Sequence, residues 1–326
     1  MTGSDPHDAA PRLPAHEKNA ADERFLARLN EWMAAMPLAG AADGSGGLPI
    51  VYVVGAPRSG TTLVSQLLAK YLEVGYINNL IARFWSRPMA GIRLSEICLG
   101  PDARRTISLR STHGVTADIA GPHEFGYFWR HWLQLDRAAT HHLTDAEIRR
   151  VDGDGLGKVL REEILGGFNR PTVFKNVICG FQAGLLSRVH PPSLFIHVTR
   201  DPIATAGSIL AARVARYGDV GAWWSLKPGS FDSIKHIASP AQQVARQVRD
   251  CRSEFATELS SAGVRSLTVS YEEICAAPDS LLVRVCDALR PLGADLQPLS
   301  AVEALSPSAG PALSRDLHDE LTAAFA

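Results

Sequence analysis

The first stretch of the chain whose residues could do chemistry is the segment 50–64, IVYVVGAPRSGTTLV. Five apolar residues are followed by a turn of small residues, and then by two hydroxyls that open a helical pattern. A strand, a loop and a helix in this order place loop amides and the positive end of the helix dipole around one concavity. The segment therefore predicts an anion-binding site formed by Arg58, Ser59, Gly60, Thr61 and Thr62.

This loop differs from the Walker A motif at one position. In that motif Gly-x-x-x-x-Gly is followed by Lys, whereas Gly60 is followed here by Thr61, and the positive charge lies earlier, on Arg58. The missing lysine is the group that clamps the β and γ phosphates of ATP. Its absence argues against phosphoryl transfer but not against phosphate binding. A glycine turn before an ordinary buried helix is the alternative.

A second cationic site is predicted in the segment 193–210, SLFIHVTRDPIATAGSIL. A buried strand ends at Arg200, and Pro202 suits the first position of a helix that Asp201 would cap. Ser208 falls on the second turn of that helix. An arginine fork and a hydroxyl, here Arg200 and Ser208, can bind one phosphate together. The alternative is a strand-end turn with a local ion pair.

These two segments resemble the nucleotide-binding motifs of sulfotransferases that use 3′-phosphoadenosine 5′-phosphosulfate (PAPS). In that family a similar loop binds the 5′-phosphosulfate, and an Arg-Asp-Pro start with a Ser eight positions after the Arg binds the 3′-phosphate. The resemblance covers about residues 50–290. It implies a P-loop-like α/β fold, a parallel β-sheet flanked by helices on both faces. It also implies in-line transfer of a sulfuryl group from PAPS to an acceptor hydroxyl, without a metal, releasing 3′-phosphoadenosine 5′-phosphate (PAP).

A third segment, 266–278 (SLTVSYEEICAAP), reads as a short strand followed by a helix that opens with Tyr-Glu-Glu. Members of the family carry a similar Tyr-Glu-Asp segment whose tyrosine lies against the adenine side of the nucleotide. The resemblance therefore implies that Tyr271 contacts the cofactor. A strand-end tyrosine that packs on the core is the alternative.

The carboxyl end departs from one branch of the family. Cytosolic eukaryotic members grip the 3′-phosphate with a C-terminal Arg-Lys-Gly motif, which this chain lacks. The difference indicates the bacterial and Golgi-like branch. It leaves open whether Arg213 or Arg216 supplies the missing cation.

Sulfuryl transfer requires a base for the acceptor proton and a positive charge on the departing oxygen. Lys175 ends the apolar run 172–175 (TVFK), which predicts an ammonium at the carboxyl edge of the sheet, where ligands of open α/β folds bind. Many bacterial relatives have a similar strand ending in Lys, so the resemblance implies that Lys175 stabilises the leaving group. The alternative is a solvated strand-end lysine.

The base is predicted to be Glu124 or His123, in the segment 121–130 (GPHEFGYFWR). Relatives use a His or a Glu, often in a similar acidic-Phe segment. We expect the following aromatic run to desolvate Glu124 and to raise its pKa. The other common position for the base follows the P-loop helix, where this chain has Asn78 and Asn79 and no carboxylate.

That departure keeps two other functions open. One is a P-loop-type small-molecule kinase, which Thr61 in the lysine position disfavours. The other is a non-catalytic PAP-binding protein that kept the cofactor site and lost the base.

The segment 217–231 (YGDVGAWWSLKPGSF) is a long, Gly-rich and apolar loop. Its place after the cofactor helix predicts a lid over the acceptor, with Trp223 and Trp224 stacking on a sugar or aromatic acceptor. Some bacterial sulfotransferases have a similar Trp-Trp-x-x-Lys-Pro stretch. The alternative is that both tryptophans pin the loop to the core.

Composition limits the partners and the location. The 326 residues have a net charge of −1 without a block of like charge, so we expect binding neither to nucleic acid nor to a membrane surface. The five scattered cysteines lack Cys-x-x-Cys spacing, and the histidines lack ligand-like spacing, which predicts a cytoplasmic protein without a metal. Without a signal peptide or a membrane-length apolar run, we expect a soluble enzyme. Its acceptor is expected to be a small molecule or glycan with a free hydroxyl, and homo-oligomerisation is left open.

The chain divides into three predicted parts. Residues 1–20 are polar and predict a disordered tail. Residues 21–48 predict a packing helix and a flexible linker, and the helix places one apolar stripe on the core, formed by Phe25, Leu26, Leu29, Trp32, Met33 and Met36. Residues 49–326 predict a single domain of alternating strands and helices. Its predicted strands are 50–54, 172–175, 194–198 and 266–270, with at least one more before 110.

Overall fold

The computed structural model describes residues 10–36, 47–100, 103–112, 114–261, 263–308 and 314–326. A five-stranded sheet runs through it in the order β2–β3–β1–β4–β5, and every neighbouring pair is parallel. In that order the strands are Gly75–Tyr76, Thr172–Lys175, Ile50–Val54, Ser193–Thr199 and Ser266–Ser270. The four predicted strands and the additional one before residue 110 are confirmed.

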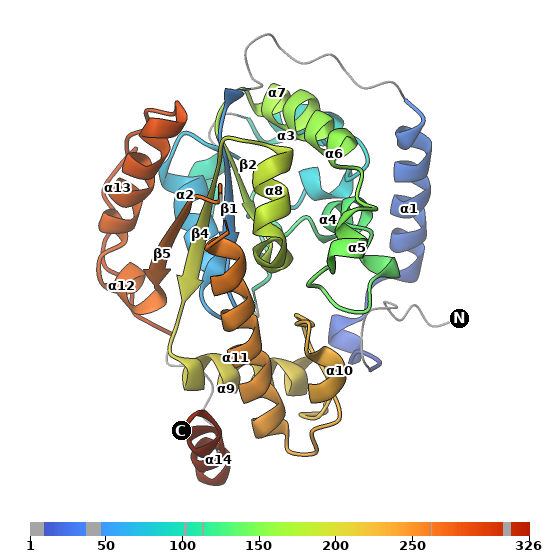
Figure 1. Cartoon of the computed structure of the whole chain (residues 1–326). Coiled ribbons are helices and arrows are strands. Elements are labelled where there is room, and N and C mark those ends of the chain that lie inside the picture. Colours follow the sequence, from blue (N-terminus) through green and yellow to red (C-terminus); the bar gives the residue numbers. More distant parts are fainter. Residues whose placement is uncertain (1–9, 37–46, 101–102, 113, 262, 309–313) are drawn as a thin grey trace.

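Helices occupy most of the connections between strands (Figure 1). Those of the amino-terminal half are α1 (Ala20–Ala34), α2 (Thr61–Tyr71), α3 (Pro88–Leu99), α4 (Gly126–Trp132), α5 (Asp145–Ile148), α6 (Gly153–Val159) and α7 (Gly166–Phe168), with a π-helical stretch over Leu160–Leu165 between the last two. Those of the carboxyl-terminal half are α8 (Ala183–Val189), α9 (Pro202–Tyr217), α10 (Phe231–Ile234), α11 (Pro240–Leu259), α12 (Tyr271–Ala276), α13 (Pro278–Leu289) and α14 (Arg315–Phe325).

The central strand β1 is buried on both of its faces, as its uninterrupted apolar sequence predicts. Side chains alternate across a strand, so Ile50, Tyr52 and Val54 pack into a core covered by α4, α8 and α11. Val51 and Val53 pack into a second core covered by α2 and α13. Figure 1 shows these two groups of helices on opposite sides of the sheet. The predicted fold class, a P-loop-like parallel α/β sheet with helices on both faces, is confirmed.

The parallel arrangement brings the carboxyl ends of four strands to one edge of the sheet. β1 leads into the loop that contains Arg58, and β3 ends at Lys175. β4 is followed at once by Arg200, and β5 is followed by Tyr271. Residues that lie far apart in the sequence therefore meet where a parallel sheet binds its ligands.

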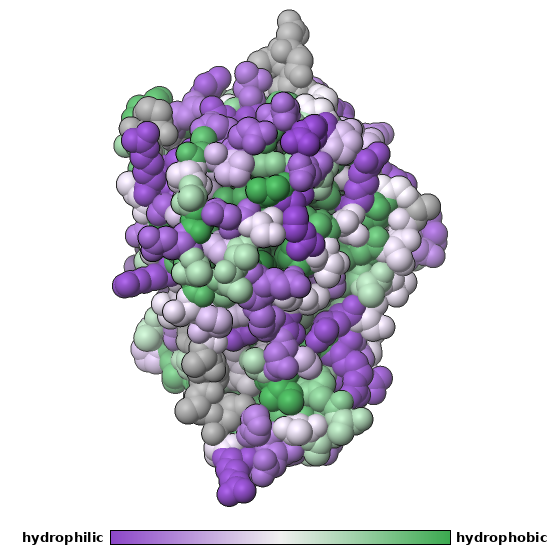
Figure 2. All heavy atoms as spheres, turned by 90° about the vertical axis from the view of Figure 1, so that its left-hand side faces the viewer, coloured by the Kyte–Doolittle hydropathy of each residue, from purple (hydrophilic) through white to green (hydrophobic). Residues whose placement is uncertain are grey.

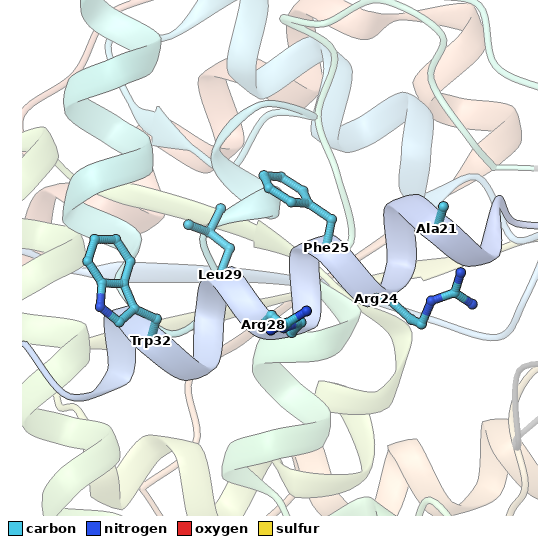
Figure 3. Close-up of a pocket in the computed structure, with 6 residues that line it drawn as sticks. All are labelled: Ala21, Arg24, Phe25, Arg28, Leu29 and Trp32. Atoms are coloured by element: carbon cyan, nitrogen blue, oxygen red, sulfur yellow. The ribbon is translucent and has the colours of Figure 1, made fainter.

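Half of the apolar stripe predicted to pack helix α1 on the core is exposed instead. Phe25, Trp32 and Met36 are 65%, 72% and 50% exposed, whereas Met33 and Asn30 are buried. The Asn30 side-chain amide fixes the helix by donating to the Arg83 carbonyl at 2.8 Å and accepting from the Ser86 amide at 2.9 Å. A polar residue therefore anchors α1, and the core prediction is wrong for Phe25, Trp32 and Met36. Figure 3 shows Phe25, Leu29 and Trp32 side by side on the outward face, beside Arg24 and Arg28.

The structure describes the amino-terminal segment from residue 10 onward; the rest of the predicted disordered tail lies outside the described residues, as do residues 37–46 of the predicted linker. Leu13 donates its amide to the Arg216 carbonyl at 2.8 Å, at the end of α9. The Lys18 ammonium contacts the Tyr127 hydroxyl, which also contacts Glu23 of α1. Residues 13–18 thus run along the body of the domain between α9 and α4.

The side of the molecule that carries α12 and α13 is covered mostly by hydrophilic residues, with smaller apolar areas between them (Figure 2). This distribution agrees with a net charge of −1 that comes from 33 basic and 34 acidic residues spread along the chain.

Tyr52 generates a prediction about stability. Its ring stacks on Phe195 and Phe174 at centroid distances of 4.8 and 5.9 Å and meets Trp129 edge-on at 5.9 Å. Its hydroxyl is fully buried and has no hydrogen-bond partner among the described residues, and burial raises the pKa of Tyr52 well above its ordinary value. An unpaired buried hydroxyl costs free energy. We therefore expect Tyr52→Phe to increase the free energy of unfolding by about 1 kcal/mol.

Thermal and denaturant unfolding would measure this change. Tyr71→Phe, on the half-buried end of α2, is the matched control and should stay within about 0.5 kcal/mol of the unmodified protein. A loss of stability in Tyr52→Phe would show that the hydroxyl contributes a favourable contact.

Candidate active site

The loop between β1 and α2 adopts a conformation that few residues tolerate. Arg58 has φ 68° and Gly60, which caps the amino end of α2, has φ 102°. A Cβ atom on Gly60 would lie 2.5 Å from Cδ2 of Tyr271, so glycine lets the tyrosine ring contact the loop. Backbone strain at non-glycine residues such as Arg58 concentrates at functional sites. The loop presents the first turn of an eleven-residue helix to the edge of the sheet.

Two arginines converge on this loop. Arg58 donates from Nε to the Ser208 hydroxyl at 2.9 Å, and Arg200 donates to the Arg58 carbonyl at 3.2 Å. Burial, and after it the positive charge of Arg200, lower the pKa of Arg58 below its ordinary value. Among the described residues neither guanidinium forms an ion pair with a carboxylate. Two neighbouring cations that form no direct ion pair with a described carboxylate, beside a helix amino terminus, form a site that an anion stabilises.

Arg200 is also fixed from the other side. Its guanidinium lies 4.5 Å from the centroid of the Tyr271 ring and donates to the Ser308 carbonyl at 3.0 Å. The Ser308 amide in turn donates to the Tyr271 hydroxyl at 2.9 Å. The structure thus brings together the predicted cofactor residues Arg58, Arg200, Ser208 and Tyr271. Ser308, which the sequence did not single out, links two of them.

The hydroxyls of the loop differ in their surroundings. Thr62 donates to the Gly114 carbonyl at 3.3 Å and so ties the loop to Gly114. The Ser59 hydroxyl is buried without a hydrogen-bond partner among the described residues. Ser59, Thr61 and Thr62 are all buried, at the start of α2. An unsatisfied buried hydroxyl at a helix amino terminus is a group that a bound oxyanion would satisfy.

Lys175 and Glu124 form an ion pair at the neighbouring strand end. Lys175 is 5% exposed, whereas the Glu124 side chain is 48% exposed and faces the open side of the site. The Asn176 amide donates to the Glu124 carbonyl at 2.9 Å, and the next residue, Phe125, has φ 55°, so the backbone turns sharply at the carboxylate. The segment is therefore held from two sides around Glu124.

The pKa of Glu124 moves opposite to our expectation. Partial burial does raise it, but the Lys175 ammonium, with smaller contributions from His123 and Arg216, outweighs burial and holds the pKa of Glu124 below its ordinary value. The expected net rise was wrong because the sequence does not show that a buried cation lies against this carboxyl. Glu124 is consequently ionised at neutral pH.

His123 is less suited than Glu124 to accept a proton. Its Nδ1 accepts a hydrogen bond from the Phe125 amide at 2.8 Å, so the ring proton lies on Nε2. Burial lowers the pKa of His123 to about 4, despite the opposing effect of Glu124. The imidazole is neutral, and its unprotonated nitrogen, Nδ1, already accepts the hydrogen bond from the Phe125 amide.

Asn78 and Asn79 have structural roles beside this segment. Asn78 accepts from the Leu80 and Ile81 amides at 3.1 and 2.8 Å and caps the turn that follows. The chain at Asn78 pairs with Pro122, and Ile77 accepts from the His123 amide at 2.8 Å. Glu124 therefore follows a segment that pairs with the chain at Asn78, so the two positions that the sequence offered for a base are close in space.

The two tryptophans of the loop after α9 have different surroundings. Trp223 is buried, meets Phe231 edge-on at 4.8 Å and lies under the Arg213 guanidinium at 5.6 Å. Arg213 is buried as well. It donates to the Val220 carbonyl of the loop at 3.3 Å and, on α11, to Gln243 at 2.7 Å and Gln247 at 3.1 Å, so it joins the loop to α11. Trp223 pins the loop to the core, whereas Trp224 is half-buried and lines a cavity.

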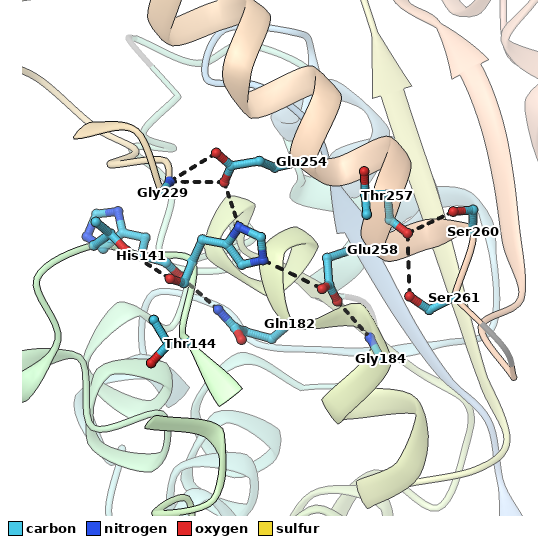
Figure 4. A network of polar contacts seen from close by, with 12 residues as sticks. His141, Thr144, Gln182, Gly184, Gly229, Glu254, Thr257, Glu258, Ser260 and Ser261 are labelled. Carbon is cyan, nitrogen blue, oxygen red and sulfur yellow. Dashed lines mark hydrogen bonds and ion pairs between the residues drawn. The ribbon is translucent and has the colours of Figure 1, made fainter. Parts of the chain in front are cut away.

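A polar network holds the far end of the same loop (Figure 4). His142 contacts Glu254 at 2.7 Å and Glu258 at 3.6 Å, and Glu254 accepts from the Gly229 amide at 3.0 Å. Next to it, His141 accepts from the Lys227 amide at 3.0 Å. Sequence spacing alone could not reveal this network, because the loop, the two histidines and α11 meet only in the folded chain.

No group of three or more potential metal ligands is found in the part of the chain that the structure describes. Within the same residues, no helix is both long enough and apolar enough to cross a membrane. The cysteines are unpaired, and all but Cys98 are buried.

His142 generates a prediction about pH. Hydrogen bonds to Glu254 and Glu258 raise the pKa of His142 from 6.5 to about 9, so the folded protein holds this proton more tightly than the unfolded chain does. The stabilisation is complete below about pH 6.5 and is lost as the pH rises through about 9. We expect His142→Gln to lower the free energy of unfolding by about 2 kcal/mol at pH 6 and by much less at pH 10.

Melting temperatures across this pH range would test the expectation. His236→Gln, at an exposed position, serves as the control and should show no such trend. A His142→Gln defect of equal size at pH 6 and pH 10 would show that the charge of the ring does not stabilise the loop.

Comparison with known proteins assigns the chain to a family. Among curated protein sequences none matches it. Solved structures with a similar fold include sulfotransferase STF9 from Mycobacterium avium, with 14% identity over 96% of this chain and 77% of that one and a TM-score of 0.48. Sulfotransferase STF1 from Mycobacterium tuberculosis follows, with 17% identity, 93% and 80% coverage and a TM-score of 0.46. The family model described as "Sulfotransferase family" matches residues 49–291, more than half of the chain. The chain therefore belongs to the sulfotransferase family.

Proposed function

We propose that this sulfotransferase takes the sulfuryl group from PAPS, transfers it to an acceptor hydroxyl and releases PAP. The observation that carries the proposal is a pair of neighbouring guanidiniums: Arg58 donates to Ser208, and Arg200 donates to the Arg58 carbonyl. Among the described residues neither forms an ion pair with a carboxylate. PAPS carries a 3′-phosphate that ATP lacks, and such a group needs a second cation beside the loop that binds the 5′ side.

The residues divide between the two ends of the nucleotide. The loop residues Arg58 to Thr62 bind the 5′-phosphosulfate, where the buried Ser59 hydroxyl gains a partner. Arg200 and Ser208 bind the 3′-phosphate, and Tyr271 contacts the adenine side. The contact between Arg200 and the Tyr271 ring supports this arrangement. It fixes the guanidinium proposed to bind the 3′-phosphate next to the ring proposed to contact the adenine.

The chemical step is a direct in-line displacement at sulfur. The acceptor oxygen forms a new O–S bond while the bond from sulfur to the bridging phosphate oxygen breaks, and its electron pair stays on the 5′-phosphate of PAP. The Lys175 ammonium stabilises the charge on that oxygen. The Glu124 carboxylate takes the acceptor proton.

The ion pair between Lys175 and Glu124 couples these two roles. In the structure Lys175 neutralises Glu124. When negative charge develops on the bridging oxygen, the ammonium is drawn toward it, and the carboxylate loses part of its counter-ion. Glu124 then becomes a stronger base at the moment when the acceptor proton must leave. His123 serves to hold the backbone at Glu124 through the Phe125 amide.

Arg200→Ala tests the nucleotide site. Removing a charge-assisted contact to the 3′-phosphate should weaken PAP binding by about tenfold or more, while ADP, which lacks that phosphate, should bind with nearly unchanged affinity. Calorimetric titration of both nucleotides would measure the difference. Unchanged affinity for PAP would remove Arg200 from the 3′-phosphate site.

Glu124→Gln tests the base. The amide keeps the shape of the side chain but cannot accept the proton, so we expect turnover with PAPS to fall by about a hundredfold or more. PAP affinity should be retained, because Glu124 is not assigned to the nucleotide. The parallel variant His123→Gln should keep most of the turnover. The reverse pattern would make His123 the base, and normal turnover of both variants would exclude this segment from proton transfer.

A further inference from the structure

A cavity of about 230 Å³ lies two turns along α9 from the predicted 3′-phosphate residue Ser208. Ala212 and Arg216 follow Ser208 at intervals of four residues, so all three lie on one stripe of the helix. At 1.5 Å per residue, Arg216 is about 12 Å along the axis from Ser208. One stripe of α9 therefore contacts the cofactor loop at one end and lines the cavity at the other.

The other walls of the cavity come from three separate segments. Trp224 contributes a half-buried ring, and its carbonyl accepts from the Gln247 amide at 3.0 Å, which fixes the position of the residue. Thr112 and Val115 line the cavity and exchange two backbone hydrogen bonds of 3.0 and 2.9 Å. His16 closes it from the amino-terminal segment. That segment is held at α9 by the hydrogen bond from Leu13 to the Arg216 carbonyl.

One wall of the cavity also contacts the cofactor loop. Gly114 precedes the lining residue Val115, and its carbonyl accepts from Thr62 of that loop at 3.3 Å. A Cβ atom on Gly114 would lie 3.6 Å from a guanidinium nitrogen of Arg58. The cavity is thus next to the proposed sulfuryl donor site.

The lining has a definite chemical character. Trp224, Val115 and Ala212 offer flat or apolar surface, and Arg216 contributes a permanent positive charge to the lining. Of the six described residues that line the cavity, none is acidic. The volume is below the roughly 300 Å³ at which pockets for drug-sized ligands begin, so it suits a single ring with a short substituent.

We propose that this cavity binds the acceptor and selects a small phenol that carries a carboxylate or similar anionic group. The ring packs against Trp224, and the anionic group binds Arg216. This inference rests on the proposed function in that the phenolic hydroxyl is the group that receives the sulfuryl. Arg216 is a specificity-determining residue in this assignment, and it does not take part in the transfer itself.

The test compares two matched probes, 4-hydroxyphenylacetate and its neutral amide. Their binding is measured by calorimetric titration, with and without PAP. We expect the carboxylate to bind about tenfold more tightly than the amide, because a charge-assisted contact to Arg216 distinguishes them. Arg216→Gln should bring the two affinities within about twofold of each other, and Arg216→Lys should keep part of the preference. Arg24→Gln, on the exposed face of α1, is the control and should keep all of it.

The kinetic counterpart compares the same two probes. With PAPS as donor, Arg216→Gln should raise KM for the carboxylate by about tenfold and leave KM for the neutral amide within about twofold. Equal affinity of the unmodified protein for the two phenols, no binding of the carboxylate up to about 5 mM, or a preference that persists in Arg216→Gln would each overturn the proposal.

The PAP titration makes the two failures distinguishable. If PAP does not bind but the phenols are discriminated through Arg216, the cavity assignment stands and the PAPS donor is wrong. If PAP binds but the phenols are not discriminated, the cavity assignment fails and the proposed donor stands.

Discussion

The site depends on two arginine guanidiniums that are held close together without a carboxylate between them in the described part of the chain. Arg58 and Arg200 repel each other, and the repulsion shows in the lowered pKa of Arg58, second to the effect of burial. Contacts from different elements keep them in place. Arg58 donates to the Ser208 hydroxyl, and Arg200 donates to the Arg58 carbonyl and lies against the Tyr271 ring. A protein that builds such an arrangement gains binding energy when an anion with two phosphate-like groups enters.

The second charged pair of the site behaves differently. Lys175 and Glu124 neutralise each other, and Lys175 is almost fully buried. In the mechanism that we propose, this buried ammonium has two partners in turn, the carboxylate and the leaving oxygen. The parallel sheet supports this proposal, because β1 and β3 are neighbours in register and their carboxyl ends place the loop after β1 and Lys175 side by side.

Much of this arrangement could be predicted from the sequence. Short segments rich in apolar residues predicted four of the strands, of which only β1 is apolar throughout. The loop at 55–60 and the Arg-Asp-Pro segment marked the two strand ends that carry the cations. Parallel pairing alone then brings these residues together. The predictions failed where they depended on contacts between distant segments. The stripe of α1 reads as a core face, yet the helix is anchored by Asn30 and leaves Phe25 and Trp32 exposed. Likewise, Lys175, which is 51 positions away in the chain, lowers the pKa of Glu124. The sequence around Glu124 contains no pattern that predicts this contact.

The most direct measurement is the affinity of the unmodified protein for PAP compared with ADP, by calorimetric titration under the same conditions. PAP has one phosphate on each of its 3′ and 5′ sides, whereas ADP has both of its phosphates on the 5′ side, so a preference for PAP reports the second cationic site. We expect PAP to bind in the micromolar range, at least about tenfold more tightly than ADP. Equal affinity for the two nucleotides, or no binding of PAP, would contradict the claim that the paired arginines form a PAPS site.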